Sequence, residues 1–249
     1  MLAGKGISTN ILYHAIAKEF PVEAIILEEP VSKSTFLRKR VRKLGFWKVC
    51  GQILFQSTII PFLKLFAKGR SKEIIKTNDL DVSELPAGKI KNVQSVNDEL
   101  CISLLKGLSP QIVVVNGTRI ISKEILNCVH ATFINMHAGI TPKYRGVHGA
   151  YWALVNNDKE NCGVTIHTVD EGIDTGDWIA QTNISPTTKD NFTTYPLLQT
   201  AAGIPLMIDA IKSIADGNLK TSKGSGESKL WSHPTLWQYL INRMKSRVR

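Results

Sequence analysis

The chain has 249 residues, 43% of them hydrophobic, which fits one large or two small α/β domains with a sizeable core. Its formal net charge of +10 suits phosphate-bearing substrates, nucleic acid or an anionic membrane surface without choosing among them. The first residues lack a signal-peptide pattern, and no uncharged apolar run reaches the roughly 18 residues of a membrane span. The cysteines are widely scattered, which predicts reduced thiols in a cytosolic protein rather than a zinc site or a disulfide frame. They are Cys50, Cys101, Cys128 and Cys162.

The N-terminal stretch predicts a glycine-containing turn over 4–10 that opens a helix over 11–17. Unpaired amides and the helix dipole at such a turn form a natural cradle for phosphate, although an ordinary turn is the alternative. The strand expected before the turn has only Met1–Ala3 available, so it is very short or the native start lies upstream. The candidate phosphate-binding residues are Gly6, Ser8, Thr9 and Asn10.

A basic and apolar segment, residues 33–68, follows the predicted strand at 22–27 and precedes the next strand. We expect two or three inserted helices, with a break or kink at Pro61 because proline lacks an amide hydrogen. One interpretation is a partly buried helical insertion with a solvated basic face. The other is an amphipathic surface that contacts a membrane or a lipid-linked substrate through its aromatic residues. These are Phe46, Trp47, Phe55, Phe62 and Phe66.

The rest of the chain alternates between strand-like and helix-like segments. This alternation predicts a doubly wound α/β domain over 1–216 with a mostly parallel central sheet. A small, polar linker over 217–228 and a docking helix near 230–240 would make a short C-terminal appendage, residues 217–249. The predicted strands lie at 111–116, 131–137, 162–169 and 178–184, and the predicted helices at 96–108, 122–126, 150–156 and 192–214.

Two polar residues, Asn135 and His137, end the predicted strand at 131–137 and point to the same face of it. Ligands of open α/β sheets bind beyond the carboxyl ends of the strands, which is where this pair falls. By itself the pair favours a polar strand end capped by a turn. Asp174 lies one strand further on, in the corresponding loop at the same edge of the sheet.

An amide, an imidazole and a carboxylate at one sheet edge can support acyl transfer to an amine. Asn135 and a protonated His137 would donate to the oxyanion of the tetrahedral intermediate, and Asp174 would receive the proton of the attacking amine, directly or through water. The carboxylate is expected to raise the pKa of His137 and keep it charged near neutral pH. Because no serine or cysteine nucleophile is placed here, direct transfer is preferred to an acyl-enzyme.

Three segments, 134–137, 142–146 and 170–176, resemble the motifs of the folate-dependent formyltransferase family. The resemblance is good over 109–185, looser over 3–30 and weak elsewhere. It implies a Rossmann-like formyltransferase fold, 10-formyltetrahydrofolate as the formyl donor, no metal, and a catalytic trio of Asn135, His137 and Asp174.

The resemblance also assigns residues around that trio. Two segments match those that wrap the pterin, largely through backbone groups: Arg119, Ile120 and Ile121, and Val169, Asp170, Glu171 and Gly172. His148 and His167 match positions near the active site, although each could also be a packed or hydrogen-bonded histidine. The turn at 4–10 resembles the one that holds substrate phosphate in the ribonucleotide enzyme of the family, but it departs in detail.

A nucleotide-linked amino sugar is the first hypothesis for the acceptor, because the insertion and the aromatic tail depart from a minimal ribonucleotide enzyme. Glycinamide ribonucleotide is the runner-up. Methionyl-tRNA is less favoured, since the tRNA enzyme carries a further β-rich domain for which this chain has no room, and no nucleic-acid partner is expected. A non-catalytic membrane-surface protein is the rival class, against which the complete trio argues. A homo-oligomer remains open.

Overall fold

A seven-stranded sheet forms the centre of the computed structural model, which describes residues 1–32 and 34–249 with their side chains. Its order is β3-β2-β1-β4-β5-β7-β8, with parallel pairing up to β5 and antiparallel pairing beyond it. The predicted doubly wound, mostly parallel sheet is therefore confirmed. The strands are β1 (Leu2–Gly4), β2 (Ile25–Glu28), β3 (Ile90–Val93), β4 (Ile112–Asn116), β5 (Thr132–His137), β7 (Gly163–Thr168) and β8 (Trp178–Asn183).

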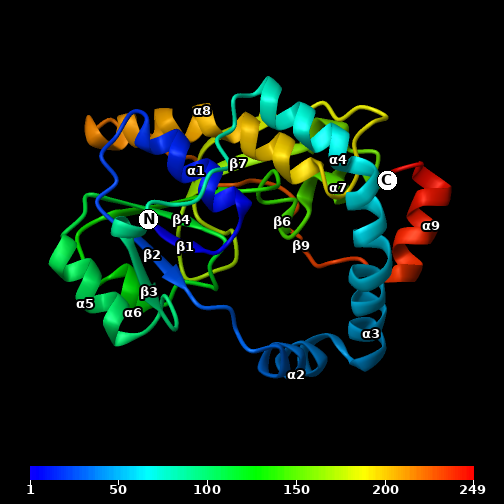
Figure 1. The fold of residues 1–249 in the computed structure, drawn as a ribbon, viewed down its shortest axis with the longest axis horizontal. Coiled ribbons are helices and arrows are strands. Elements are labelled where there is room, and N and C mark those ends of the chain that lie inside the picture. Colours follow the sequence, from blue (N-terminus) through cyan, green and yellow to red (C-terminus); the bar gives the residue numbers. More distant parts are fainter.

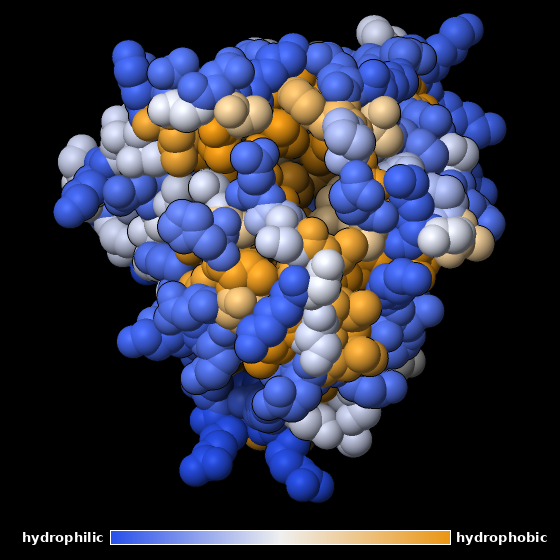
Figure 2. All heavy atoms as spheres, turned by 90° about the vertical axis from the view of Figure 1, so that its left-hand side faces the viewer, coloured by the Kyte–Doolittle hydropathy of each residue, from blue (hydrophilic) through white to orange (hydrophobic). Residues whose placement is uncertain are grey.

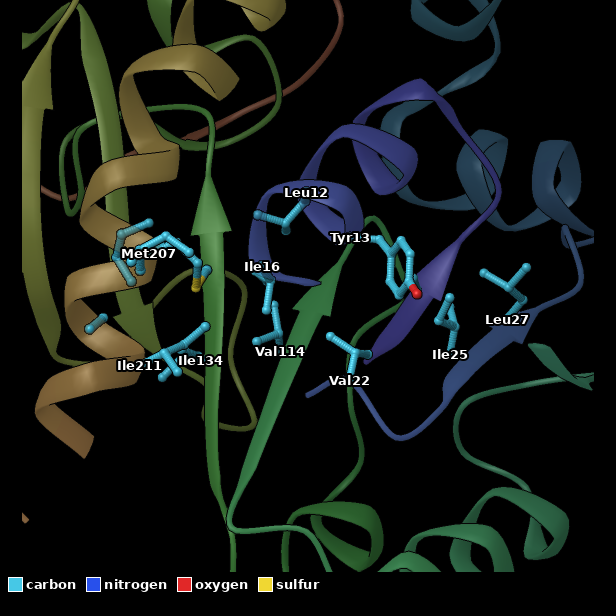
Figure 3. Close-up of a cluster of buried hydrophobic side chains, with 14 residues drawn as sticks. Leu12, Tyr13, Ile16, Val22, Ile25, Leu27, Val114, Ile134, Met207 and Ile211 are labelled. Carbon is cyan, nitrogen blue, oxygen red and sulfur yellow. The ribbon is translucent and has the colours of Figure 1, made fainter. Parts of the chain in front are cut away.

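Helices cover both faces of this sheet (Figure 1). Because side chains alternate along a strand, Val114 of β4 enters one core with α1 and α8, whereas Val113 and Val115 enter the opposite core with α5 and α6. Figure 3 shows the first core, in which Val114 and Ile134 lie between α1 and α8. The covering helices are α1 (Ile7–Ala17), α5 (Glu99–Leu108), α6 (Lys123–Leu126), α7 (Gly149–Val155) and α8 (Tyr195–Ala215).

The insertion is helical, and it extends beyond its expected end. It contains α2 (Lys33–Leu44), α3 (Phe46–Leu54), a π turn η1 (Phe55–Ile59) and α4 (Ile60–Thr77). Pro61 lies in the first turn of α4, where its missing amide hydrogen is tolerated, and the π turn directly precedes it. The polar segment after α4 ends in β3, an edge strand that the sequence pattern did not reveal.

Two helical stretches, Phe46–Thr77 and Tyr195–Ala215, are long and apolar enough to cross a membrane by length and composition alone. The second is α8, whose Met207 and Ile211 are buried against the sheet, so it is a core helix. In the first stretch 28% of the most apolar window is buried, close to the 33% of α8, but its Trp47 and Phe66 side chains are 84% and 70% exposed. Its exposed apolar side chains therefore require a separate explanation.

The C-terminal segment packs against the insertion and the loop before α7. β9 (Leu230–Trp231) pairs in parallel with β6 (Arg145–Gly146), and α9 (Leu236–Ser246) begins with a capping box at Thr235. The Trp231 ring stacks on Trp152 with ring centroids 4.6 Å apart. The tail is therefore part of the domain wall near β5 rather than a loose appendage.

Glycines allow the loop after β5 to fold back on itself. A Cβ at Gly149 would lie 2.5 Å from the Cα of Gly139 and 2.7 Å from the carbonyl oxygen of Ala138. A Cβ at Gly139 would lie 2.8 Å from Nε2 of His137. Backbone atoms cannot yield as a flexible side chain can, so the position of His137 depends on both glycines.

We expect Gly149→Ala to destabilise the protein by about 1–3 kcal/mol, because the added methyl group meets fixed backbone. Gly69→Ala is the matched control: Gly69 lies in α4 with open space around it, and the substitution should stabilise by about 0.5–1 kcal/mol. Urea unfolding measures both changes. Equal stability of Gly149→Ala and the parent chain would contradict the predicted close packing.

Candidate active site

A cavity of about 1,210 Å³ lies at the carboxyl ends of β4 and β5. Ligands of open α/β sheets bind at this edge, as the sequence led us to expect. The three predicted catalytic residues, Asn135, His137 and Asp174, all line it. The remaining wall comes from the ends of α1 and α8, from the loops at 117–121 and 169–173, from α2 and from the tail at 230–233.

Asn135 is held by His167, its register partner across the antiparallel β5–β7 pair. Nδ1 of His167 lies 2.7 Å from the carbonyl oxygen of Thr168, which can only accept, so Nδ1 carries the proton. Nε2 lies 3.1 Å from Nδ2 of Asn135, and because an amide nitrogen can only donate, Nε2 is the acceptor of this contact. The amide is thereby oriented, and it retains a second N–H that this contact does not use.

His137 is buried, and both of its ring nitrogens face acceptors. Nε2 donates to the carbonyl oxygen of Tyr144 at 2.7 Å, and Nδ1 lies 3.3 Å from Oδ2 of Asp174. A carbonyl offers no proton and an ionised carboxylate offers none either. The His137–Asp174 contact therefore becomes a hydrogen bond only when one further proton enters the pair.

Asp174 is fixed by the loop that carries it. Its backbone is left-handed, with φ of 51°, and Oδ2 accepts the amide hydrogen of Gly146 at 2.8 Å. The guanidinium of Arg145 donates to the carbonyl oxygen of Ile173 at 3.1 Å and holds the loop against β6. Oδ1 lies 3.7 Å from Nε2 of His167, so the carboxylate touches both histidines.

The charges of this pair differ from the sequence-based expectation. Burial lowers the pKa of His137, and this effect outweighs the raising effects of Asp174 and of the Tyr144 carbonyl. Burial raises the pKa of Asp174, but His167, His137 and the Gly146 amide outweigh it, so the pKa lies below its ordinary value. The expectation that the carboxylate keeps His137 charged near neutral pH is therefore wrong. The pair rests as a neutral imidazole beside a carboxylate.

The residues matched to pterin contacts surround one end of the cavity, apart from Glu171, which does not line it among the described residues. Arg119 is committed to the protein: its guanidinium lies 2.6 Å from the buried carboxylate of Glu28 and donates to the Glu29 carbonyl at 3.0 Å. It therefore anchors the loop at 117–121, which leaves Ile120 and Ile121 to face the cavity.

Of the four candidate phosphate-binding residues in the N-terminal turn, Ser8 alone lines the cavity among the described residues. The Thr9 hydroxyl is buried, donates to the Gly4 carbonyl at 2.6 Å and accepts from Asn116 at 2.9 Å. This inward hydrogen bonding corrects the prediction for Thr9. Gly6 and Asn10 also lie outside the cavity wall, where Gly6 caps α1 by accepting from the Asn10 amide.

His148 is packed in the protein, whereas His167 takes part in the site. Nε2 of His148 lies 3.1 Å from Nδ1 of His233, and its ring packs on Phe192 at 4.0 Å. Burial lowers the pKa of His148 to about 3 and that of His233 to about 4, so both rings are neutral near pH 7. In the described part of the chain, the cavity wall includes His233 but not His148.

Two distant segments complete the cavity and were not predicted as site residues. From α2 come Lys39, Arg40 and Lys43, and from the tail come residues 230–233. Gln52 joins the two: its Oε1 accepts from Nε of Arg40 at 2.9 Å, and its Nε2 donates to the His233 carbonyl at 2.6 Å. The charge run in α2 and the aromatic tail were visible in the sequence, but no local pattern placed them at β5.

Comparisons with known proteins agree with this geometry. The model of the formyl transferase family matches residues 64–202, which include Asn135, His137 and Asp174. A methionyl-tRNA formyltransferase of Thermodesulfovibrio yellowstonii is 34% identical over 189 residues, covering 68% of this chain and 60% of that protein. The chain thus spans less than two thirds of that relative's length.

Solved structures share the fold at low identity. Phosphoribosylglycinamide formyltransferase of Streptococcus pneumoniae superposes with a TM-score of 0.53 and 19% identity, covering 86% of this chain and 98% of that one. An N-formyltransferase of Helicobacter canadensis, solved with folinic acid and dTDP-3-aminofucose, superposes with a TM-score of 0.51 and 18% identity. This match covers 93% of this chain and 69% of that one. Because the family match covers more than half of its length, the chain belongs to the formyl transferase family.

Proposed function

We propose that this chain transfers a formyl group from 10-formyltetrahydrofolate to a primary amine of a nucleotide-linked amino sugar. The observation that carries the proposal is the meeting of Asn135, His137 and Asp174 in one cavity that also has a basic wall. At about 1,210 Å³ the cavity exceeds the range of roughly 300–1,000 Å³ usual for one small ligand. It therefore offers room for a donor and an acceptor together.

The donor fits the end of the cavity formed by the loops at 117–121 and 169–173. Ile120, Ile121 and Val169 present apolar surface there, which suits a flat heterocycle, and the loop backbone provides polar groups at its edge. The Helicobacter canadensis neighbour was solved with folinic acid, a folate, which supports a folate donor here. When bound, the folate supplies the activated formyl group.

Asn135 and the His137–Asp174 pair have different roles in the transfer: the first stabilises the oxyanion and the second accepts a proton. Attack by the amine forms the new C–N bond and moves an electron pair onto the formyl oxygen, where the free N–H of Asn135 donates a hydrogen bond. The proton lost by the amine enters between His137 Nδ1 and Asp174, where a proton turns a repulsive contact into an ion pair. Collapse of the intermediate breaks the bond to the folate nitrogen, which would take the proton back from the His137–Asp174 pair as it leaves, so that the pair returns to its resting form.

The basic wall supports a phosphate-bearing acceptor. Lys39, Arg40 and Lys43 of α2 line the same cavity as the catalytic residues, and residues 31–72 contain no Asp or Glu to neutralise them. Burial lowers the pKa of Arg40, whose Nε donates a hydrogen bond to Gln52. An anion beside this guanidinium would offset the cost of removing its charge from water. A nucleoside diphosphate provides such an anion close to an amino sugar.

Two other acceptors enter the test because the comparisons name them. Glycinamide ribonucleotide remains the runner-up, since its phosphate would also suit the basic wall, and the Streptococcus pneumoniae neighbour is named for that substrate. Among the described residues of the N-terminal turn, Ser8 alone lines the cavity, and this argues against the turn as the phosphate site that glycinamide ribonucleotide would need. Methionyl-tRNA enters because the sequence relatives are named methionyl-tRNA formyltransferases, although the chain spans only part of their length.

A mass-spectrometric screen tests the proposal. Purified protein, 10-formyltetrahydrofolate and a panel of nucleotide-linked 3-amino and 4-amino sugars should yield a product with the mass gain of one formyl group. Glycinamide ribonucleotide and methionyl-tRNA form separate arms of the panel. A mass gain in either of those arms but in no amino sugar would replace the proposed acceptor, and no gain in any arm would refute the proposed transfer.

With the acceptor found, we expect Asn135→Ala to lower kcat by about 10²–10³, because the oxyanion loses a preoriented donor. Asp174→Asn should lower kcat by about 10²–10⁴, since the amide cannot take the amine proton. Steady-state kinetics measures both. The matched controls are Asn183→Ala and Asp177→Asn, neither of which lines the cavity, and both should keep kcat. Full turnover by either site variant would remove that residue from the mechanism.

The double variant Lys39→Gln with Lys43→Gln should raise KM for the acceptor by about tenfold and leave kcat nearly unchanged, because two charges facing the phosphates are lost. The control is Lys64→Gln with Lys68→Gln, two exposed lysines of α4 outside the cavity. An unchanged KM in the first variant would show that α2 does not contact the acceptor.

A further inference from the structure

The helices α3, η1, α4 and α9 form one helical layer, and α2 lies at its lower end (Figure 1); we call these five elements the platform. Figure 1 shows α3 and α4 running along one side of the domain, with α9 beside them. Gly51 of α3 lies against Thr235, and Phe55 packs on Tyr239 with ring centroids 5.0 Å apart. These buried contacts fix α9 to α3 and η1, so their outward faces belong to one surface.

That surface exposes large apolar side chains. Trp47 is 84% exposed, Phe66 is 70% exposed and Trp237 is 62% exposed. Isolated exposed apolar residues are ordinary, but a series along one helical layer marks an interaction surface. The further exposed members are Phe46, Ile53, Leu54, Phe62 and Leu65 on α3 and α4, and Leu240, Ile241 and Met244 on α9.

The π turn keeps these residues on one side of the long helix. An α-helix advances by about 100° per residue, and a π turn takes up one extra residue. With that extra residue counted, Phe62 and Phe66 of α4 share the side occupied by Phe46 and Leu54 of α3, while buried Phe55 and Leu63 share the other. Both helices therefore present one continuous apolar stripe to solvent.

Positive charge is concentrated on the same layer. Residues 31–72 and 236–249 contain 15 of the 31 Lys and Arg residues and none of the 21 Asp and Glu residues. Four of these 15, Lys39, Arg40, Lys43 and Lys48, line the cavity, and Glu73, further along α4, pairs with Arg70. The remainder of the chain holds 16 basic against 21 acidic residues, so it is net acidic. Figure 2 shows hydrophilic side chains crowding the narrow lower end of the molecule, where Figure 1 places α2.

This combination selects one occupant. A second copy would bring a like-charged platform against the first, and the repulsion opposes such a dimer. An anionic bilayer instead matches both features: aromatic and aliphatic side chains enter the boundary between headgroups and acyl chains, and lysines reach the phosphates on flexible stems. We infer that the platform binds the surface of membranes that contain anionic lipids.

Vesicle flotation tests this surface on the full chain. The protein should float with vesicles of phosphatidylcholine containing about one third phosphatidylglycerol, and much less with phosphatidylcholine alone. Raising NaCl from about 0.1 M to about 0.5 M should weaken the binding, because salt screens the attraction. Equal flotation with both kinds of vesicle, or none with either, would overturn the inference.

Two variants separate the apolar and electrostatic contributions. Trp47→Ala with Phe66→Ala should weaken binding to the anionic vesicles by about tenfold or more, whereas Leu100→Ala, an exposed leucine on α5, should not. Lys64→Glu with Lys68→Glu should also weaken binding to the anionic vesicles, whereas Lys91→Glu with Lys106→Glu, on β3 and α5, should leave this binding unchanged. All four substituted platform residues lie outside the cavity, so the rate of formyl transfer in solution reports intact folding.

Sedimentation of the parent chain and of the Trp47→Ala, Phe66→Ala variant completes the test. The two should have the same mass in solution. A parent dimer that the variant breaks into monomers, without binding to vesicles, would identify the platform as an interface between copies and overturn the inference. Flotation measures lipid binding without turnover, so a negative result leaves the proposed formyl transfer standing.

Discussion

The buried contact between His137 and Asp174 is the constraint on which the site depends. The Tyr144 carbonyl occupies one ring nitrogen of His137, and the carboxylate faces the other at 3.3 Å. Burial makes the uncharged ring the resting form, so the pair lacks the proton that would join it. A reaction that releases a proton beside this contact is thereby favoured, and amine formylation is such a reaction.

Much of the fold serves to hold that contact. Gly139 and Gly149 allow the loop after β5 to return close enough for the Tyr144 carbonyl to reach His137. Gly146 donates its amide hydrogen to Asp174, and it lies in β6, whose partner β9 belongs to the tail. The C-terminal segment thus supports the carboxylate from more than fifty residues away. The same segment and α2 close the cavity through Gln52, which links the cavity wall to the inserted helices.

The sequence allowed the central fold and the meeting of Asn135, His137 and Asp174 at one edge of the sheet to be predicted, because both arise from local patterns. Apolar runs separated by turn residues locate β4 and β5, and strand ends locate Asn135 and His137. The charge of His137 could not be read in the same way, since it depends on burial that only the folded chain creates. The roles of Thr9 and His148 were obscured for a related reason: a hydroxyl or an imidazole can face a ligand or the interior, and distant partners such as Asn116 and His233 decide which.

The protonation state of His137 decides whether the His137–Asp174 contact can receive the proton of the amine. Nitrogen chemical shifts of its imidazole, measured by NMR in the unliganded protein near pH 7.5, distinguish the two neutral tautomers from the imidazolium. We predict a neutral ring with its proton on Nε2 and a bare Nδ1 facing Asp174. An imidazolium with protons on both nitrogens at that pH would contradict this prediction, because the pair would then already hold the proton that it is proposed to receive.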